Sequence, residues 1–74
     1  MLNTVEADFA RQLAVRVRAL RMRHALSQQD LAERARLSRN VIINLEHGTR
    51  LPRLSSVRKI ARALGVTPAQ LTAA

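Results

Sequence analysis

Residues 27–48 read SQQDLAERARLSRNVIINLEHG, and two capping patterns divide this stretch into two short helices. Ser27 is a good N-cap, and Asp30 at the third helical position is able to reach back to it. Ser38 is placed to cap the second helix, which Gly48 is placed to end in a left-handed C-cap. The stretch therefore predicts two short helices joined by a tight turn.

The two helices divide their side chains between a packed face and an outer face. Their apolar residues have the spacing of a pair of packed helices: Leu31, Ala35, Leu37, Ile42 and Leu45. The second helix turns four residues the other way, namely Arg39, Asn40, Ile43 and Asn44. A helix with that outer face is suited to contacting the edges of DNA bases.

A longer helix is expected before this stretch. It begins near Asn3 or Thr4, because Asn3 and Glu6 make a capping-box-like pair, and it runs to about His24. The next helix, the first of the two short ones, is expected over about residues 28–35. The core stripe expected on the longer helix consists of Phe9, Leu13, Val17 and Leu20.

Two more helices are expected after a loop that contains Pro52. The first covers about residues 54–64 and is stopped by Gly65. The residues that it is expected to bury are Leu54, Val57, Ile60, Ala61 and Leu64. Thr67 followed by Pro68 opens a last short helix, since threonine caps well and proline is tolerated at the first helical position.

No strand pattern, repeat or linker competes with these five helices. We therefore predict an all-α fold with one compact domain over residues 1–74, in which residues 1–12 extend the first helix and residues 28–46 form a helix-turn-helix. A core of this size leaves a net stability of only about 3–5 kcal/mol, so that a partner subunit would help.

The charge balance favours a polyanionic partner. Thirteen basic residues, all but one of them arginine, stand against five acidic residues, which gives a net charge of +8. Nucleic acid is the leading candidate. A membrane surface is disfavoured, because Phe9 is the only aromatic residue, and no segment approaches the roughly 20 apolar residues of a membrane span. Without a signal-peptide pattern, the expected location is cytoplasmic.

The sequence shows no pattern of an enzyme or of a metal site. It has no cysteine, and its two histidines are separated by helical chain. We find no Ser-His-acid set that the helices could bring together, and no glycine-rich phosphate loop. We expect no enzymatic activity, no cofactor and no metal. RNA binding through charge alone stays an alternative, although one aromatic residue offers almost no platform for base stacking.

Five pieces of the chain fall in one register. They read Leu13-x-x-Arg-Val-Arg-x-Leu-Arg, Leu26-Ser-Gln-x-x-Leu-Ala, Leu37-Ser-x-x-x-Ile-x-x-Leu-Glu-x-Gly, Pro52 and Ile60-Ala-x-Ala-Leu-Gly-Val. Together they resemble the Cro and phage-repressor type of helix-turn-helix regulator, the XRE family, over about residues 13–71. The resemblance implies a repressor-like domain of five helices, whose third helix enters the major groove of DNA while the second lies across the backbone.

The resemblance also implies roles for single residues. Base contacts fall on Arg39, Asn40, Ile43 and Asn44, and the chemistry agrees, since arginine pairs with guanine, asparagine with adenine, and an apolar side chain with the thymine methyl group. Phosphate contacts fall on Gln28, Ser38, His47 and Thr49, although His47 at a helix end also suits the helix dipole. A minor-groove contact falls on Arg53, and whether Arg50 shares it is left open.

The resemblance further implies a structural ion pair and two unusual turns. Arg21 and Glu46 match positions at which family members pair the first helix with the end of the third. Ala25 and Arg36 stand where many members have glycine. A non-glycine residue with positive φ costs roughly 1 kcal/mol, so a turn distorted by Arg36 would move the third helix from its usual position. Ile43 also departs from the small polar residue of many members.

These features predict a DNA-binding transcriptional regulator that acts as a homodimer on an inverted repeat, with half-sites about 34–36 Å apart. A chain this short resembles restriction-modification controllers or small autoregulators. Dimer contacts are expected at Leu51, Leu54 and Val57, which are also candidates for the core. The alternative is an antitoxin that binds a toxin-like protein and uses DNA binding for autoregulation. Glu33 could face RNA polymerase, but a solvated acid is the simpler interpretation.

Overall fold

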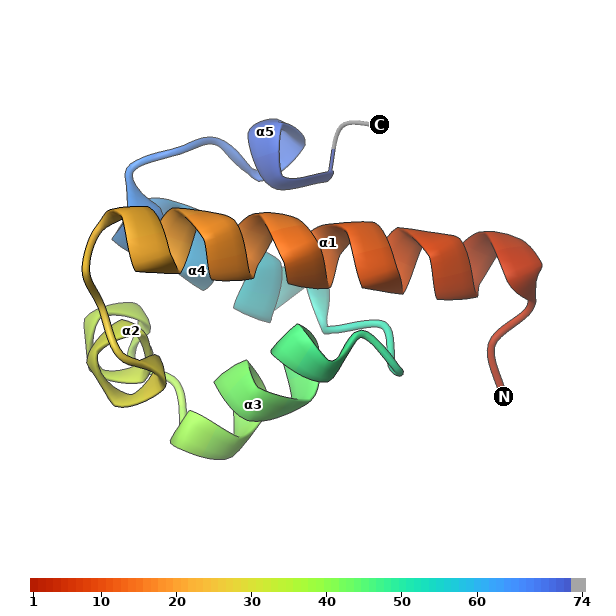
Figure 1. Cartoon of the computed structure of the whole chain (residues 1–74), viewed down its shortest axis with the longest axis horizontal. Helices are drawn as coiled ribbons and strands as arrows, with labels where there is room; N and C mark the ends of the chain where they lie inside the picture. Colours follow the sequence, from red (N-terminus) through yellow and green to blue (C-terminus); the bar gives the residue numbers. More distant parts are fainter. Residues whose placement is uncertain (73–74) are drawn as a thin grey trace.

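The computed structural model describes residues 1–72, and in that range the chain forms five helices (Figure 1). Their bounds are α1 Thr4–Arg23, α2 Gln28–Ala35, α3 Arg39–His47, α4 Leu54–Leu64 and α5 Pro68–Thr72. No strand occurs among these described residues. The structure confirms the predicted all-α fold and the predicted order of its helices.

Side-chain caps fix the beginnings of four helices, as the sequence predicts. At α1 the Asn3 Oδ1 accepts from the Glu6 N–H at 2.8 Å, and the Glu6 carboxylate accepts from the Asn3 N–H at 3.1 Å. Reciprocal pairs of the same kind join Ser27 with Asp30 at α2 and Thr67 with Gln70 at α5, and Ser38 caps α3. The helix α4 differs, because its N-cap residue Arg53 makes no capping bond through its side chain.

The Ser27 cap also changes the acidity of its partner. Hydrogen bonding to Ser27, above all the backbone N–H that donates to the Asp30 Oδ2 at 3.0 Å, lowers the pKa of the Asp30 carboxyl group. The charged form of Asp30 is therefore the one that the capping box favours at neutral pH.

All five helices contribute to one core. In Figure 1, α1 spans the molecule, with α3 below it, α2 near its C-terminal end, α4 behind it and α5 above it. The side chains that are almost fully buried come from each helix: Leu13, Val17, Leu31, Ile42, Ile60, Leu64 and Leu71. The predicted helix-turn-helix residues Leu31, Ala35, Ile42 and Leu45 are buried, and Leu37 packs partly buried against them. Burial of this cluster holds α2 and α3 in a fixed relation.

Two residues expected in the core lie elsewhere. Phe9 is 38% exposed and Leu54 is 62% exposed, so both predictions of burial were wrong. Phe9 lies in the N-terminal part of α1, which extends beyond the other helices in Figure 1, and Leu54 is the first residue of α4. Helical spacing identifies a face but does not show where the neighbouring elements end.

Small residues take the inner positions of α1 where α3 ends against it. Ala10 and Ala14 are buried there, and Gly48 closes α3 with a φ of 70°. A Cβ atom on Gly48 would lie 3.2 Å from the Ala14 Cβ and 3.2 Å from the Arg11 Cα. Glycine is therefore required at this position both by its conformation and by the close approach of α1.

Arg36 takes the conformation of the glycine that it replaces. Its φ and ψ are 56° and 44°, and its N–H donates to the Glu33 carbonyl at 3.2 Å, while the Leu37 N–H donates to the Ala32 carbonyl at 2.9 Å. Ala25 has a φ of 56° as well. The turn between α2 and α3 thus keeps the geometry of a glycine-ended helix, and the steric cost of that geometry falls on the Arg36 backbone.

Arg36→Gly is expected to raise the free energy of unfolding by about 1 kcal/mol, because glycine removes the steric cost of the left-handed conformation. Urea denaturation followed by circular dichroism measures the change. Arg34→Gly is the matched control, since Arg34 is exposed inside α2 and should lose about 1 kcal/mol on the same change. A lower urea midpoint for Arg36→Gly than for the wild-type protein would contradict the inference that the Arg36 backbone is strained.

Candidate nucleic-acid interface

The outer face of α3 carries the residues predicted to contact bases. Arg39, Asn40 and Asn44 are exposed, Ile43 is half-buried, and the core side of the same helix buries Ile42. Three of the four residues predicted to contact bases therefore lie together on an exposed helix face, and Ile43 lies at the margin of that face. Arginine and asparagine on such a face match the donor and acceptor patterns of guanine and adenine in the major groove.

A buried ion pair fixes the far end of α3. Arg21 of α1 donates from Nε to the Glu46 Oε2 at 2.7 Å and from Nη2 to the Glu46 Oε1 at 2.9 Å. The two side chains are only 13% and 6% exposed. Arg21 also donates from Nη1 to the Leu26 carbonyl at 2.8 Å, and its hydrogen bond to Glu46 raises its pKa. This two-point contact ties the angle of α3 to α1 and to the turn before α2.

The residues predicted to contact phosphates surround this helix. Gln28, at the start of α2, is half-buried and donates from Nε2 to the Glu46 Oε1 at 3.3 Å. An amide nitrogen carries two N–H groups, so this bond leaves a second donor for a phosphate. Ser38 is exposed at the start of α3, although its hydroxyl accepts from the Val41 N–H at 3.3 Å. The exposed His47 lies at the opposite end of α3.

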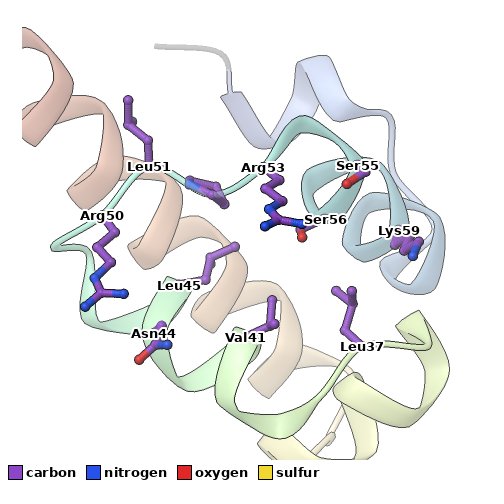
Figure 2. A pocket seen from close by; sticks show the side chains of 11 residues that line it. Leu37, Val41, Asn44, Leu45, Arg50, Leu51, Arg53, Ser55, Ser56 and Lys59 are labelled. Atoms are coloured by element: carbon purple, nitrogen blue, oxygen red, sulfur yellow. The ribbon is translucent and has the colours of Figure 1, made fainter.

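A groove of about 510 Å³ separates α3 from the beginning of α4 (Figure 2). Leu37, Val41 and Leu45 form one wall, and Arg53, Ser56 and Lys59 belong to the other. Asn44 and Arg50 lie at one end of the groove, and Thr49 beside them is exposed. The sequence did not single out Ser55, Ser56 or Lys59. The sequence did contain one signal for these residues. Two serines follow the N-cap position of α4, which is occupied by an arginine that makes no capping hydrogen bond through its side chain.

The predicted dimer contacts separate into two groups. Leu51 on the loop is 40% exposed, and Leu54 at the first position of α4 is 62% exposed. Val57 is only 5% exposed and packs in the core, so the expectation that it contacts a second subunit needs correction. Its side chain has almost no area left to bury against a partner.

Two other kinds of site are not found in the described part of the chain. Among residues 1–72, no three His, Cys, Asp or Glu side chains gather in a way that could hold a metal ion. No helix in the same range is long and apolar enough to cross a membrane.

Comparisons with known proteins agree with this geometry. The helix-turn-helix family model HTH_3 matches residues 17–71. The control protein C.BamHI of Bacillus amyloliquefaciens is 40% identical over 72 residues, which are 96% of this chain and 84% of that protein. The immunity repressor protein of Bacillus phage phi105 is 39% identical over 51 residues, or 69% of this chain, and this match spans only 35% of the repressor's length.

Two solved structures share both fold and sequence with this chain. The hypothetical transcription factor NHTF from Neisseria has a TM-score of 0.83 at 34% identity, with 90% of this chain and 77% of that chain covered. The restriction-modification controller protein C.AhdI from Aeromonas hydrophila has a TM-score of 0.79, also at 34% identity, with 84% and 94% covered. The likeness therefore extends from the helix-turn-helix to the surrounding helices.

Proposed function

The chain belongs to the helix-turn-helix family and is a DNA-binding transcriptional regulator of that family, and we propose that it acts as a homodimer on an inverted-repeat operator. Members of the family regulate transcription and are not enzymes. The observation that carries the proposal is the outer face of α3, where Arg39, Asn40 and Asn44 are exposed on a helix whose angle the buried Arg21–Glu46 pair fixes.

In this proposal the residues around α3 divide the work of recognition. Arg39, Asn40 and Asn44 contact base edges, with Ile43 against a thymine methyl group. Phosphate contacts that set the register come from Gln28, Ser38, His47 and Thr49. The exposed Arg53, with Arg50 near it, is placed on the loop and the start of α4 to reach the minor groove or the phosphates beside it.

Two features support the homodimer. Leu51 and Leu54 expose apolar surface that a second copy would bury, and a domain of 74 residues gains stability from a partner. A two-fold dimer places two α3 helices in successive major grooves, about 34–36 Å apart, and therefore requires a palindromic site. We propose that the protein works in the cytoplasm.

Similarity to control and controller proteins favours one biological role. The likeness to C.BamHI covers nearly the whole chain, and C.AhdI is described as a restriction-modification controller. We propose such a controller, or a small autoregulator. An adjacent pair of methyltransferase and endonuclease genes is the expected genomic setting, whereas an adjacent toxin gene would instead support an antitoxin with a toxin-like partner. Glu33 is exposed on α2, which suits a solvated acid as well as a contact with RNA polymerase.

Selection of bound DNA from random duplexes tests the proposal. We expect a symmetric inverted repeat, bound with nanomolar-range affinity that weakens steeply with salt, because Lys and Arg side chains displace counterions from the phosphates. Sedimentation of the protein with the selected duplex should give two subunits per site. Recovery of duplexes without a shared sequence would contradict specific recognition, and one subunit on an asymmetric site would contradict the dimer.

A further inference from the structure

The beginning of α1 lies outside the core of the domain. No residue in the range 2–9 is buried, and burial on this helix begins at Ala10. Figure 1 shows this part of α1 extending beyond the other helices, at the end of the molecule toward which the loop between α3 and α4 bends. We call residues 2–9 the overhang. A capping box fixes the first turn of its helix, so that the overhang keeps its form without packing against the core.

The overhang exposes apolar side chains on one side of the helix. Val5 and Phe9 are four residues apart, and therefore lie one above the other on the same face. Val5 is 77% exposed and Phe9 is 38% exposed. The polar side chains of Thr4 and Asp8 belong to a different face of the same two turns. An apolar face on a helix that extends past its own core is a surface for another chain to cover.

The leucines already proposed for the dimer contact are too small to form it alone. The exposed fractions of Leu51 and Leu54, 40% and 62%, together amount to about the surface of one leucine residue. Even a large aromatic side chain buries only about 150–250 Å². A stable interface needs about 500 Å² or more from each partner. Each subunit must therefore contribute further surface to the homodimer, beyond these two leucines.

The chain places the overhang near these leucines. Gly48, where the loop after α3 begins, lies directly against α1. A Cβ atom on Gly48 would be 3.2 Å from the Arg11 Cα and 3.4 Å from the Ala10 carbonyl oxygen, just after the overhang ends. Leu51 follows three residues later on this loop, and Leu54 begins α4. The overhang, the loop and the start of α4 therefore belong to one end of the molecule.

The charges of the overhang and of α4 are complementary. Residues 2–9 contain two acidic residues and no basic one, whereas residues 47–74 contain no acidic residue. The exposed side of α4 carries Arg58 and Arg62, about one and two turns after Leu54. Two such α4 surfaces that faced each other would repel, but the overhang of a second copy would bring negative charge to them.

We propose that the overhang of each subunit packs Val5 and Phe9 against Leu51 and Leu54 of a second copy of the chain. A two-fold axis then produces two identical contacts, each of which buries side chains from both subunits. This inference rests on the proposed function and specifies the surface through which the homodimer forms. It also accounts for turns of α1 that leave apolar side chains exposed in a single subunit.

Val5→Ser and Val15→Ser are a matched pair for the test. Both valines are largely exposed on α1, at 77% and 68%, but Val15 lies ten residues further on and faces a different side. Valine and serine have similar helix propensities, so neither change should unfold the helix. Sedimentation equilibrium of the free chain should show a dimer Kd raised about 10-fold or more for Val5→Ser, because the dimer buries two copies of the side chain. Val15→Ser should change it less than about 2-fold. Equal values would overturn the proposal.

A double variant tests which residues meet across the interface. Leu54→Ser should also weaken the dimer. Adding Val5→Ser to Leu54→Ser should then raise the dimer Kd by a smaller factor than Val5→Ser does in the wild-type chain, because residues in contact do not contribute independently. Strictly multiplicative effects of the two changes would place Val5 away from Leu54 of the partner and overturn the proposed pairing.

Cysteine cross-linking tests the same contact directly, since the chain has no cysteine of its own. Val5→Cys chains mixed with Leu54→Cys chains should be joined by a short bis-maleimide reagent, both free and on the selected operator. Val15→Cys chains mixed with Leu54→Cys chains should be joined far less. If the wild-type chain is a monomer in solution and on its operator, the proposed homodimer fails. If it is a dimer but the Val5→Cys and Val15→Cys chains are joined equally, only this inference fails.

Discussion

Glu46→Gln is expected to lower the free energy of unfolding by about 3–5 kcal/mol, because it leaves the Arg21 guanidinium buried without its anionic partner. A domain of this size has a total stability of about 3–5 kcal/mol, so most molecules of the variant should be unfolded at 37 °C. Urea denaturation at low temperature, followed by circular dichroism, measures the loss.

Two comparisons isolate the burial of the pair as the cause. Asp8→Asn breaks the exposed pair between Asp8 and Arg11, and it should change stability by less than about 0.5 kcal/mol. The double variant Arg21→Met, Glu46→Leu removes both charges and should regain most of the lost stability, since apolar residues of similar size replace buried ion pairs well. A single variant that loses under about 1 kcal/mol would show that the pair is well solvated.

Local signals explain why the helix bounds follow from the sequence. The ends of these helices each depend on a few neighbouring residues, so they can be predicted from the local sequence. This holds for the caps at Asn3, Ser27 and Ser38 and for the left-handed ends at Gly48 and Gly65. The core was harder to predict for Phe9 and Leu54. Their burial depends on where distant elements stop, and periodicity carries no such information.

The candidate site also combines features that local sequence predicts with features that depend on distant parts of the chain. The exposed face of α3 follows from helical spacing. Arg21 and Glu46, however, are 25 positions apart in the sequence, and only the resemblance to a family predicted that they would pair. Ser56 left almost no signal, because serine near a helix start is ordinarily a cap. Only the fold shows that Ser56 is 8% exposed and lines a groove.

Asn44→Ala is expected to weaken binding to the selected operator by about 30-fold or more, because a bidentate contact with adenine contributes about 1–3 kcal/mol and a homodimer loses it in both half-sites. The free protein should keep its stability, since Asn44 is exposed and makes no hydrogen bond through its side chain within the described residues. Gln12→Ala is the control, because it truncates an exposed amide on α1 that lines neither side of the groove. Equilibrium binding measures both variants at one salt concentration.

The sequence preference and salt dependence of the weakened DNA binding distinguish a base contact from a phosphate contact. If Asn44 contacts a base, repeating the selection with Asn44→Ala should relax one symmetric pair of operator positions and leave the others as they were. The salt dependence should stay near the wild-type slope, because no charge is removed. The loss of a phosphate contact would, in contrast, weaken binding to all duplexes by a similar factor and keep the selected sequence. A uniform loss for Asn44→Ala would remove it from the base contacts and leave Arg39 and Asn40 to account for specificity.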